Sequence, residues 1–190
     1  MARPREYDRD EVLEKAMRVF WSKGYECTSM QDLVAAMGIN RGSLYAEFGD
    51  KEGLHLAALE RFYHNEIAPQ FAVLDRPGSL DANLRDLFNS IAESERQGLG
   101  CMISHSAVEL CPDDAEVGLM VSAGLRRAED TVHRALIRAR DEGELGADRD
   151  LRALARYLLS SVNGVRVMAR AIDDPKTVRD IVETTLSAIH

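Results

Sequence analysis

The stretch from Thr28 to Lys51 constrains the fold most, because it contains two short helical patterns joined by a glycine. The first helix is predicted to begin at Thr28, whose hydroxyl can cap it while Gln31 reaches back. Gly38 is predicted to end it, since glycine adopts the left-handed conformation without strain. Asn40 is predicted to cap the second helix. Two helices joined by such a turn form either a helix-turn-helix or an ordinary helical hairpin.

The second helix, Arg41–Phe48, has only two residues on its apolar side, Leu44 and Phe48. A helix this short is not stable alone, so neighbouring helices must hold that side and leave the other side presented. In a helix-turn-helix, the second helix enters the DNA major groove. The guanidinium of Arg41 matches O6 and N7 of guanine. Candidate DNA contacts are Arg41, Gly42 and Ser43, with Thr28 and Ser29 at the start of the first helix and Lys51 at the start of the third.

Residues 9 to about 56 also resemble one protein family at many positions of fixed spacing. The matching residues are Gly24-Tyr25, Thr28, Gly38-Ile39, Gly42-Ser43-Leu44-Tyr45, Phe48, Lys51-Glu52 and Leu54. This pattern resembles the tetracycline-repressor (TetR) family of bacterial transcription regulators. The rest of the chain resembles that family only in length and helical layout.

The resemblance implies a DNA-binding domain over 1–53, with its recognition helix at about 40–48, and a ligand-binding and dimerisation domain over 54–190. It implies that the hydroxyl of Tyr45 binds a phosphate. It further implies a regulator, more often a repressor than an activator, that a small-molecule inducer releases from a palindromic operator. Glu47 departs from the family pattern, which often has histidine there. Because a carboxylate near phosphates is repelled, Glu47 either accepts from N4 of cytosine or points away from the DNA, and we assign it no role.

The net charge is unusual for a DNA-binding protein. The chain has 24 Lys and Arg residues and 32 Asp and Glu residues, a net charge of −8. Residues 1–53 hold 8 of the basic and 10 of the acidic residues, so the predicted DNA-binding part is not basic either. Because non-specific affinity comes from phosphate neutralisation, we expect it to be weak. Arg3 and Arg5 form either a solvated tail or an arm that contacts phosphate or the minor groove.

Length and composition indicate a soluble globular protein with one or two domains. No apolar run in the 190 residues approaches the ~20 needed to span a bilayer. The N-terminal residues lack the apolar segment of a secretion signal, and the three cysteines do not suggest a disulfide framework. We therefore expect a cytoplasmic protein without a membrane partner.

Apolar periodicity predicts an all-α fold of about nine helices, with no alternation typical of strands. Asp8 and Asp50 are predicted to cap the first and fourth helices, and the fourth to kink or end near Pro69. Pro112 is predicted at the first position of a long helix that runs to about Glu142. The last two helices are predicted over about 150–172 and 174–189.

A helix-turn-helix reads few base pairs, so two copies spaced one helical turn apart, ~34 Å or a multiple, are physically expected. The last two predicted helices are amphipathic and are the expected interface, as a four-helix bundle with their mates. Alternatively, their apolar faces close the core of the single chain; the family resemblance favours the dimer. The predicted interface residues are Leu158, Ser161, Val165, Met168, Val178, Val182, Thr185 and Ile189.

The second domain is expected to bind a small molecule that the sequence does not identify. Candidate pocket residues are Phe62, Phe88, Met102, His105, Met120 and Tyr157, and ordinary core packing is the alternative for each. No cofactor is predicted.

Cys101 and His105 lie four residues apart on one helical face, and Cys111 follows. The alternatives are a metal site, a thiol that senses oxidants or electrophiles, and buried structural cysteines. The spacing does not supply four zinc ligands, so no metal is predicted. An enzyme is not expected, because the sequence has no phosphate loop, GxSxG or HExxH. A helical interaction module that does not bind DNA is a further alternative.

Overall fold

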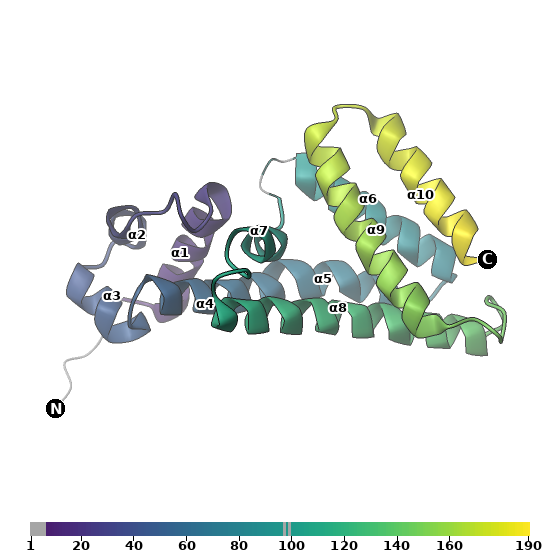
Figure 1. The fold of residues 1–190 in the computed structure, drawn as a ribbon, viewed down its shortest axis with the longest axis horizontal. Helices are drawn as coiled ribbons and strands as arrows, with labels where there is room; N and C mark the ends of the chain where they lie inside the picture. Colours follow the sequence, from purple (N-terminus) through teal and green to yellow (C-terminus); the bar gives the residue numbers. More distant parts are fainter. Residues whose placement is uncertain (1–6, 97, 99) are drawn as a thin grey trace. The chain divides into compact units, whose positions relative to one another are not determined.

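The computed structural model describes residues 7–96, 98 and 100–190, and this part of the chain contains helices and no strand (Figure 1). The all-α prediction is confirmed for these residues. In chain order the elements are α1 (Arg9–Lys23), α2 (Met30–Met37), α3 (Arg41–Phe48), α4 (Lys51–Phe62), the π-helix η1 (Tyr63–Ile67), α5 (Ala68–Phe71), the 3₁₀-helix η2 (Ala72–Asp75), α6 (Leu80–Arg96), α7 (Met102–Glu109), α8 (Ala115–Asp141), α9 (Leu151–Ala171) and α10 (Pro175–Ile189).

The chain divides into two compact units. The N-terminal unit contains the described residues up to Asn65 together with Met102–Ser122, and the C-terminal unit contains Glu66–Cys101 and Ala123–His190. This division by contacts differs from the predicted domains 1–53 and 54–190, which stay a prediction. The difference arises because α7, though distant in sequence, packs on α4.

Most helix starts follow the predicted caps. Asp8 accepts hydrogen bonds from the N–H groups of Asp10 and Glu11, and Asn40 and Asp50 cap α3 and α4 in the same way. The cap predicted at Thr28 is wrong. Ser29 caps α2 in a capping box with Asp32, because the carboxylate three residues along accepts from the Ser29 N–H at 2.9 Å.

Two helix boundaries also differ from the predictions. The fourth helix changes to a π-helix at Tyr63, before Pro69, which then lies in the first turn of the short helix α5. The long helix α8 begins at Ala115 and not at Pro112. Its cap is Asp114, whose carboxylate accepts from the N–H groups of Glu116 at 3.0 Å and Val117 at 2.9 Å.

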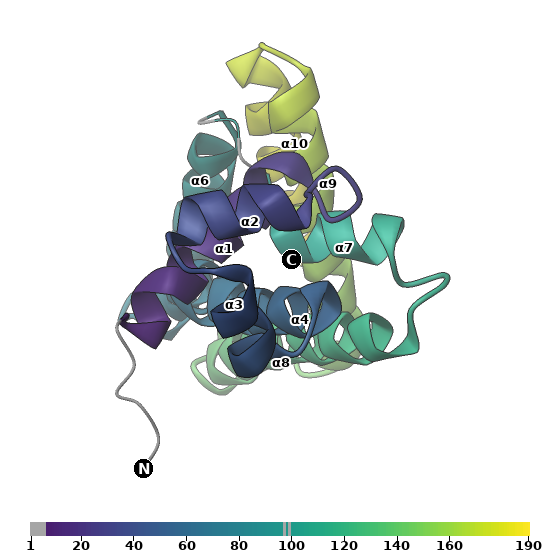
Figure 2. The same ribbon diagram turned by 90° about the vertical axis from the view of Figure 1, so that its left-hand side faces the viewer.

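The core of the N-terminal unit is built by α1, which packs on α2 and α4, while α3 packs on the other end of α4 (Figure 2). The rings of Trp21 and Phe62 meet edge to face at 4.9 Å in this core. Leu44 and Phe48, the only two apolar residues predicted to hold α3, are both buried. The short recognition segment is therefore held from one side, as predicted.

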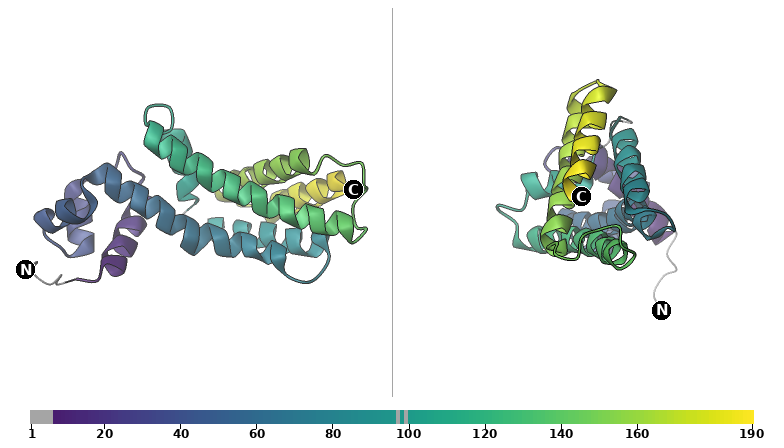
Figure 3. Two further views of the ribbon diagram at one scale, coloured as in Figure 1. Left: turned by 90° about the horizontal axis from the view of Figure 1, so that it is seen from below. Right: turned by 90° about the vertical axis from the view of Figure 1, so that its right-hand side faces the viewer.

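The core of the C-terminal unit lies between α6, α9 and α10. Helices α9 and α10 run side by side as an antiparallel pair, and α6 packs on both (Figures 1 and 3). The apolar face of α6 is buried in this core and consists of Leu84, Leu87, Phe88 and Ile91. This core also holds an ion pair between Arg166 and Glu95 at 3.0 Å, with side chains only 7% and 1% exposed. Among the described residues, no helix is both long and apolar enough to cross a membrane.

Candidate nucleic-acid interface

The outward face of α3 carries the predicted base-reading residues. Arg41, Gly42 and Tyr45 are exposed and Ser43 is partly exposed, while the apolar side of the helix faces the core. An Nη atom of Arg41 donates to the hydroxyl of Tyr45 at 3.3 Å, and the guanidinium lies 5.7 Å from the ring centroid. The arginine, which is the first residue of α3, thus extends along the exposed face towards Tyr45 one turn further on.

Glu47 points away from that face. Its carboxylate accepts from Nε of Arg9 at 2.9 Å and from the hydroxyl of Tyr7 at 3.5 Å. Its side chain is only 9% exposed. The acid that the sequence left without a role therefore joins α3 to the start of α1, and its negative charge is matched by an arginine. As a result, the exposed positions of α3 carry no carboxylate.

Thr28 does not present its hydroxyl to a phosphate. The residue is 1% exposed, and its hydroxyl donates to the carbonyl of Gly24 at 2.6 Å, which closes the loop between α1 and α2. The physical reason is the shifted helix start, which makes Thr28 part of the loop. Ser29 is the exposed residue at the N-terminus of α2 and keeps the predicted position for a phosphate contact.

Lys51 lies in the first turn of α4, with its ammonium 4.1 Å from the centroid of the Tyr25 ring. The contact with the ring π-face orients the lysine at the helix N-terminus.

The predicted DNA contacts Arg3 and Arg5 lie outside the described residues.

Gly53 is a residue that the sequence reasoning missed. A Cβ at this position would lie 2.3 Å from the carbonyl oxygen of Phe48, so only glycine lets the first turn of α4 pack on the end of α3. A glycine inside a helical pattern is the signal that points to such a close approach.

Comparison with known proteins identifies the family. The model for bacterial regulatory proteins of the tetR family matches residues 12–58, and the model for the tetracyclin repressor-like C-terminal domain matches residues 77–185. The chain belongs to the TetR family. Its members are transcriptional regulators and not enzymes, and the predictions of the family and of a DNA-binding transcriptional regulator are confirmed.

The similarity to individual TetR-family proteins extends over the whole chain. The chain is 37% identical over 194 residues to the uncharacterized HTH-type transcriptional regulator YezE of Bacillus subtilis, and the match covers 100% of both proteins. It is 34% identical to the repressor ComR of Escherichia coli, over 97% of this chain and 90% of ComR. A cysteine variant of the regulator CifR, solved with a 26-bp operator duplex, superposes with a TM-score of 0.87 at 30% identity over 100% of both chains.

The interface residues predicted for a TetR-like dimer are mostly buried within the single chain. Leu158, Val165, Val178, Val182, Thr185 and Ile189 are each at most 5% exposed, and only Ser161 and Met168 are partly exposed. These six side chains close the core against α6, as in the alternative that the sequence left open. Any partner must contact the opposite side of α9 and α10.

The candidate pocket residues are divided between the two units. Phe62, Met102, His105 and Met120 belong to the N-terminal unit, and Phe88 and Tyr157 belong to the C-terminal unit. Phe62, Phe88 and Met102 are core side chains with 2% exposure or less. Tyr157 is 43% exposed and lines an open hollow between α9 and α10.

The cysteines give little support to a sensing role. Cys101 is buried, and burial together with the nearby Asp114 carboxylate raises the pKa of the Cys111 thiol. A raised pKa lowers the fraction of reactive thiolate. Within the described ranges, no three His, Cys, Asp or Glu side chains are placed to hold a metal ion.

His55 is a buried titratable group in the N-terminal unit. Its ring meets those of Phe20 and Tyr25 edge to face at 4.9 and 4.8 Å, and Nε2 lies 3.3 Å from the hydroxyl of Ser106. Nδ1 is buried and has no hydrogen-bond partner among the described residues. Desolvation lowers the pKa of His55 to about 4, although the carboxylates of Glu109 and Asp114 oppose the shift and Lys51 adds to it.

This environment predicts a pH-dependent stability. The unfolded chain binds a proton at His55 below pH ~6.5 while the folded chain does not, so the free energy of unfolding should fall as pH falls towards 4. Between pH 7 and pH 5 the loss from this group is about 2 kcal/mol. Urea unfolding at fixed protomer concentration measures it, and His55→Gln should lack this part of the loss. An identical pH dependence in the variant would contradict the assignment.

Proposed function

We propose that the protein is a repressor that binds a palindromic operator as a homodimer in the cytoplasm and that a small-molecule inducer releases it. The observation that carries the proposal is the exposed, acid-free face of α3, with Arg41 as the first residue of the helix. The operator complex of CifR and the repressor activity in the name of ComR support it by similarity.

The proposed DNA contacts follow from exposure. Arg41 reads guanine, Gly42 permits close approach of the helix, and Ser43 and Tyr45 bond a base edge or a phosphate. Ser29 and Lys51 bind phosphates at the N-termini of α2 and α4.

The proposed dimer surface is the outward stripe of α9. The exposed, uncharged positions recur every three or four residues along the helix, and Arg156 and Arg170 are the only charged residues among its exposed positions. Val167 in the middle of the stripe is 66% exposed. A long uncharged stripe beside glycine suits close packing of two helices. The stripe consists of Ala153, Tyr157, Ser160, Gly164, Val167 and Ala171.

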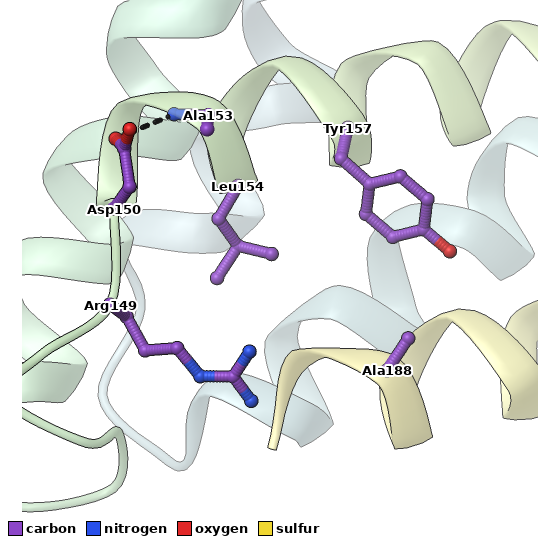
Figure 4. Close-up of a pocket in the computed structure, with 6 residues that line it drawn as sticks. All are labelled: Arg149, Asp150, Ala153, Leu154, Tyr157 and Ala188. Carbon is purple, nitrogen blue, oxygen red and sulfur yellow. Dashed lines mark hydrogen bonds between the residues drawn. The ribbon is translucent and has the colours of Figure 1, made fainter.

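Helix α10 continues this surface. The side chains of Leu154 and Tyr157 border the hollow between the two helices, with Ala188 on the opposite side (Figure 4). Thr184 is exposed one turn before Ala188, on the same side of α10. Four helices, two from each copy, would bury this hollow and its apolar lining.

Val167→Glu tests the dimer and its role in DNA binding together. Two buried like charges at a twofold interface should shift the protein to a monomer, as measured by analytical ultracentrifugation. Affinity for a duplex with both half-sites should then fall at least about 100-fold, while affinity for a single half-site is unchanged.

Ala123→Glu provides the matched control, because it adds the same charge at an exposed position of α8 in the same unit. It should leave both the sedimentation and the duplex affinity unchanged. A Val167→Glu protein that still sediments as a dimer would refute the proposed surface.

The inducer can release DNA only through a difference in its affinity for the two conformations of the dimer. The six candidate pocket residues remain proposals. Tyr157 also belongs to the proposed dimer surface on α9.

A further inference from the structure

Helix α7 is joined to the helix-turn-helix by one carboxylate. Glu109, the last residue of α7, accepts hydrogen bonds from the backbone N–H groups of Tyr25 at 3.2 Å and Glu26 at 2.7 Å. Those two residues belong to the loop that leads from α1 into α2. The bonds are charge-assisted and connect residues more than 80 positions apart, all within the N-terminal unit.

The same loop is held by its side chains. The Tyr25 ring contacts His55 and the ammonium of Lys51, both on α4, and it stacks on Phe20 of α1 at 6.0 Å between ring centroids. The hydroxyl of Thr28 closes the loop onto the carbonyl of Gly24. The loop is therefore held by contacts with α1, α4 and α7 and by a hydrogen bond within itself.

The loop is shaped to receive the carboxylate. Gly24 has φ +79°, a conformation that favours glycine, and a Cβ there would lie 3.2 Å from one Glu109 oxygen. Helix α7 also packs on α4, where the hydroxyl of Ser106 lies within hydrogen-bond distance of His55. The two contacts, one turn apart on α7, attach this helix to α4 and to the loop.

We propose that Glu109 is a positioning residue for operator recognition: it fixes the loop that sets the orientation of α2 and, through it, of the base-reading helix α3. The inference rests on the proposed DNA-binding function. Because Cys101, the residue directly before α7, belongs to the C-terminal unit, a displacement of α7 by an inducer would act on the loop through this carboxylate. Loss of these bonds would leave the unit folded but α3 misaligned.

The sign of the effect separates this role from simple electrostatics. Removing a negative charge from a DNA-binding unit strengthens its binding to any duplex, because the electrostatic repulsion between the protein and the phosphates decreases. The proposal predicts the opposite for Glu109→Gln. The two N–H groups donate to different carboxylate oxygens, and in glutamine one of these oxygens is replaced by an NH2 group that cannot accept. Glu26→Gln is the matched control, since it removes the same charge from an exposed side chain in the same loop.

The experiment uses the full chain and two duplexes, one that the wild-type protein selects from a random pool and one with the same bases scrambled. Glu109→Gln should bind the selected duplex about ten-fold more weakly and the scrambled duplex as well as the wild type does. Glu26→Gln should bind both duplexes at least as tightly as the wild type. Amide hydrogen exchange at Tyr25 and Glu26 should be faster only in Glu109→Gln.

Glu109→Asp keeps the charge but shortens the side chain by one carbon, so it should lose affinity as Glu109→Gln does. This variant also covers the case in which Glu109→Gln does not fold. The inference is overturned if either Glu109 variant matches Glu26→Gln, or if both duplexes lose affinity equally. If the wild-type protein selects no sequence, the proposed function fails first, and the inference fails with it.

Discussion

Glu95→Ala is expected to lower the free energy of unfolding by about 3–5 kcal/mol, because it leaves the buried Arg166 guanidinium without its counter-ion. Arg166 donates to Glu95 at 3.0 Å and to the side-chain oxygen of Gln70 at 3.0 Å. The pair connects α6 with α9 in the core of the C-terminal unit, where water cannot replace the missing carboxylate. Urea unfolding followed by circular dichroism at one protomer concentration measures the change.

The neighbouring acid on the same helix provides the control. Glu93 pairs with Arg96 at 3.3 Å, but both side chains are well exposed, so Glu93→Ala should cost under about 0.5 kcal/mol. Replacing both buried partners, as Glu95→Leu with Arg166→Met, should recover most of the stability lost by Glu95→Ala. Equal effects of Glu95→Ala and Glu93→Ala would show that the buried pair does not have the energetic role described here.

Arg41→Ala is expected to lower affinity for the selected operator by about 1–3 kcal/mol for each half-site, since the alanine loses a bidentate contact with guanine. Affinity for a scrambled duplex should fall much less, because the variant loses only the attraction between one positive charge and the DNA phosphates. Fluorescence anisotropy with both duplexes at one salt concentration measures the two losses.

Arg18→Ala is the matched control, because Arg18 carries the same charge in the same unit but pairs with Glu14 on the surface of α1. It should change both affinities alike and only slightly. If Arg41→Ala lowers both affinities by the same factor, Arg41 acts through its charge and does not read bases.

Features of the fold with short-range causes could be predicted from the sequence. Asp8, Asn40 and Asp50 cap their helices because each carboxylate or amide lies two or three residues from the N–H it accepts. The same reasoning failed at Thr28, where two adjacent hydroxyl residues compete for one cap. The loop hydrogen bond to Gly24 decides the competition in favour of Ser29, and that bond is a property of the folded loop.

Contacts between distant residues could not be predicted. Glu47 and Arg9 are 38 positions apart, and Glu109 and Tyr25 are 84 apart, so no periodicity connects them. The amphipathic pattern predicts the buried faces of α9 and α10, but most of the side chains predicted for the dimer interface are covered within the single chain. An amphipathic pattern predicts that one face of a helix is buried, but it does not determine whether the same chain or a second copy covers that face.

Operator binding through α3 is tested by selection of bound duplexes from a random DNA pool. The full chain is first refolded to remove any bound ligand, and Arg41→Ala is selected in parallel. A dimer that reads DNA through Arg41 should enrich a palindrome whose half-site centres lie one helical turn, or a whole number of turns, apart. The variant should lose that enrichment. Failure of the refolded wild-type protein to enrich any sequence would contradict operator binding through α3.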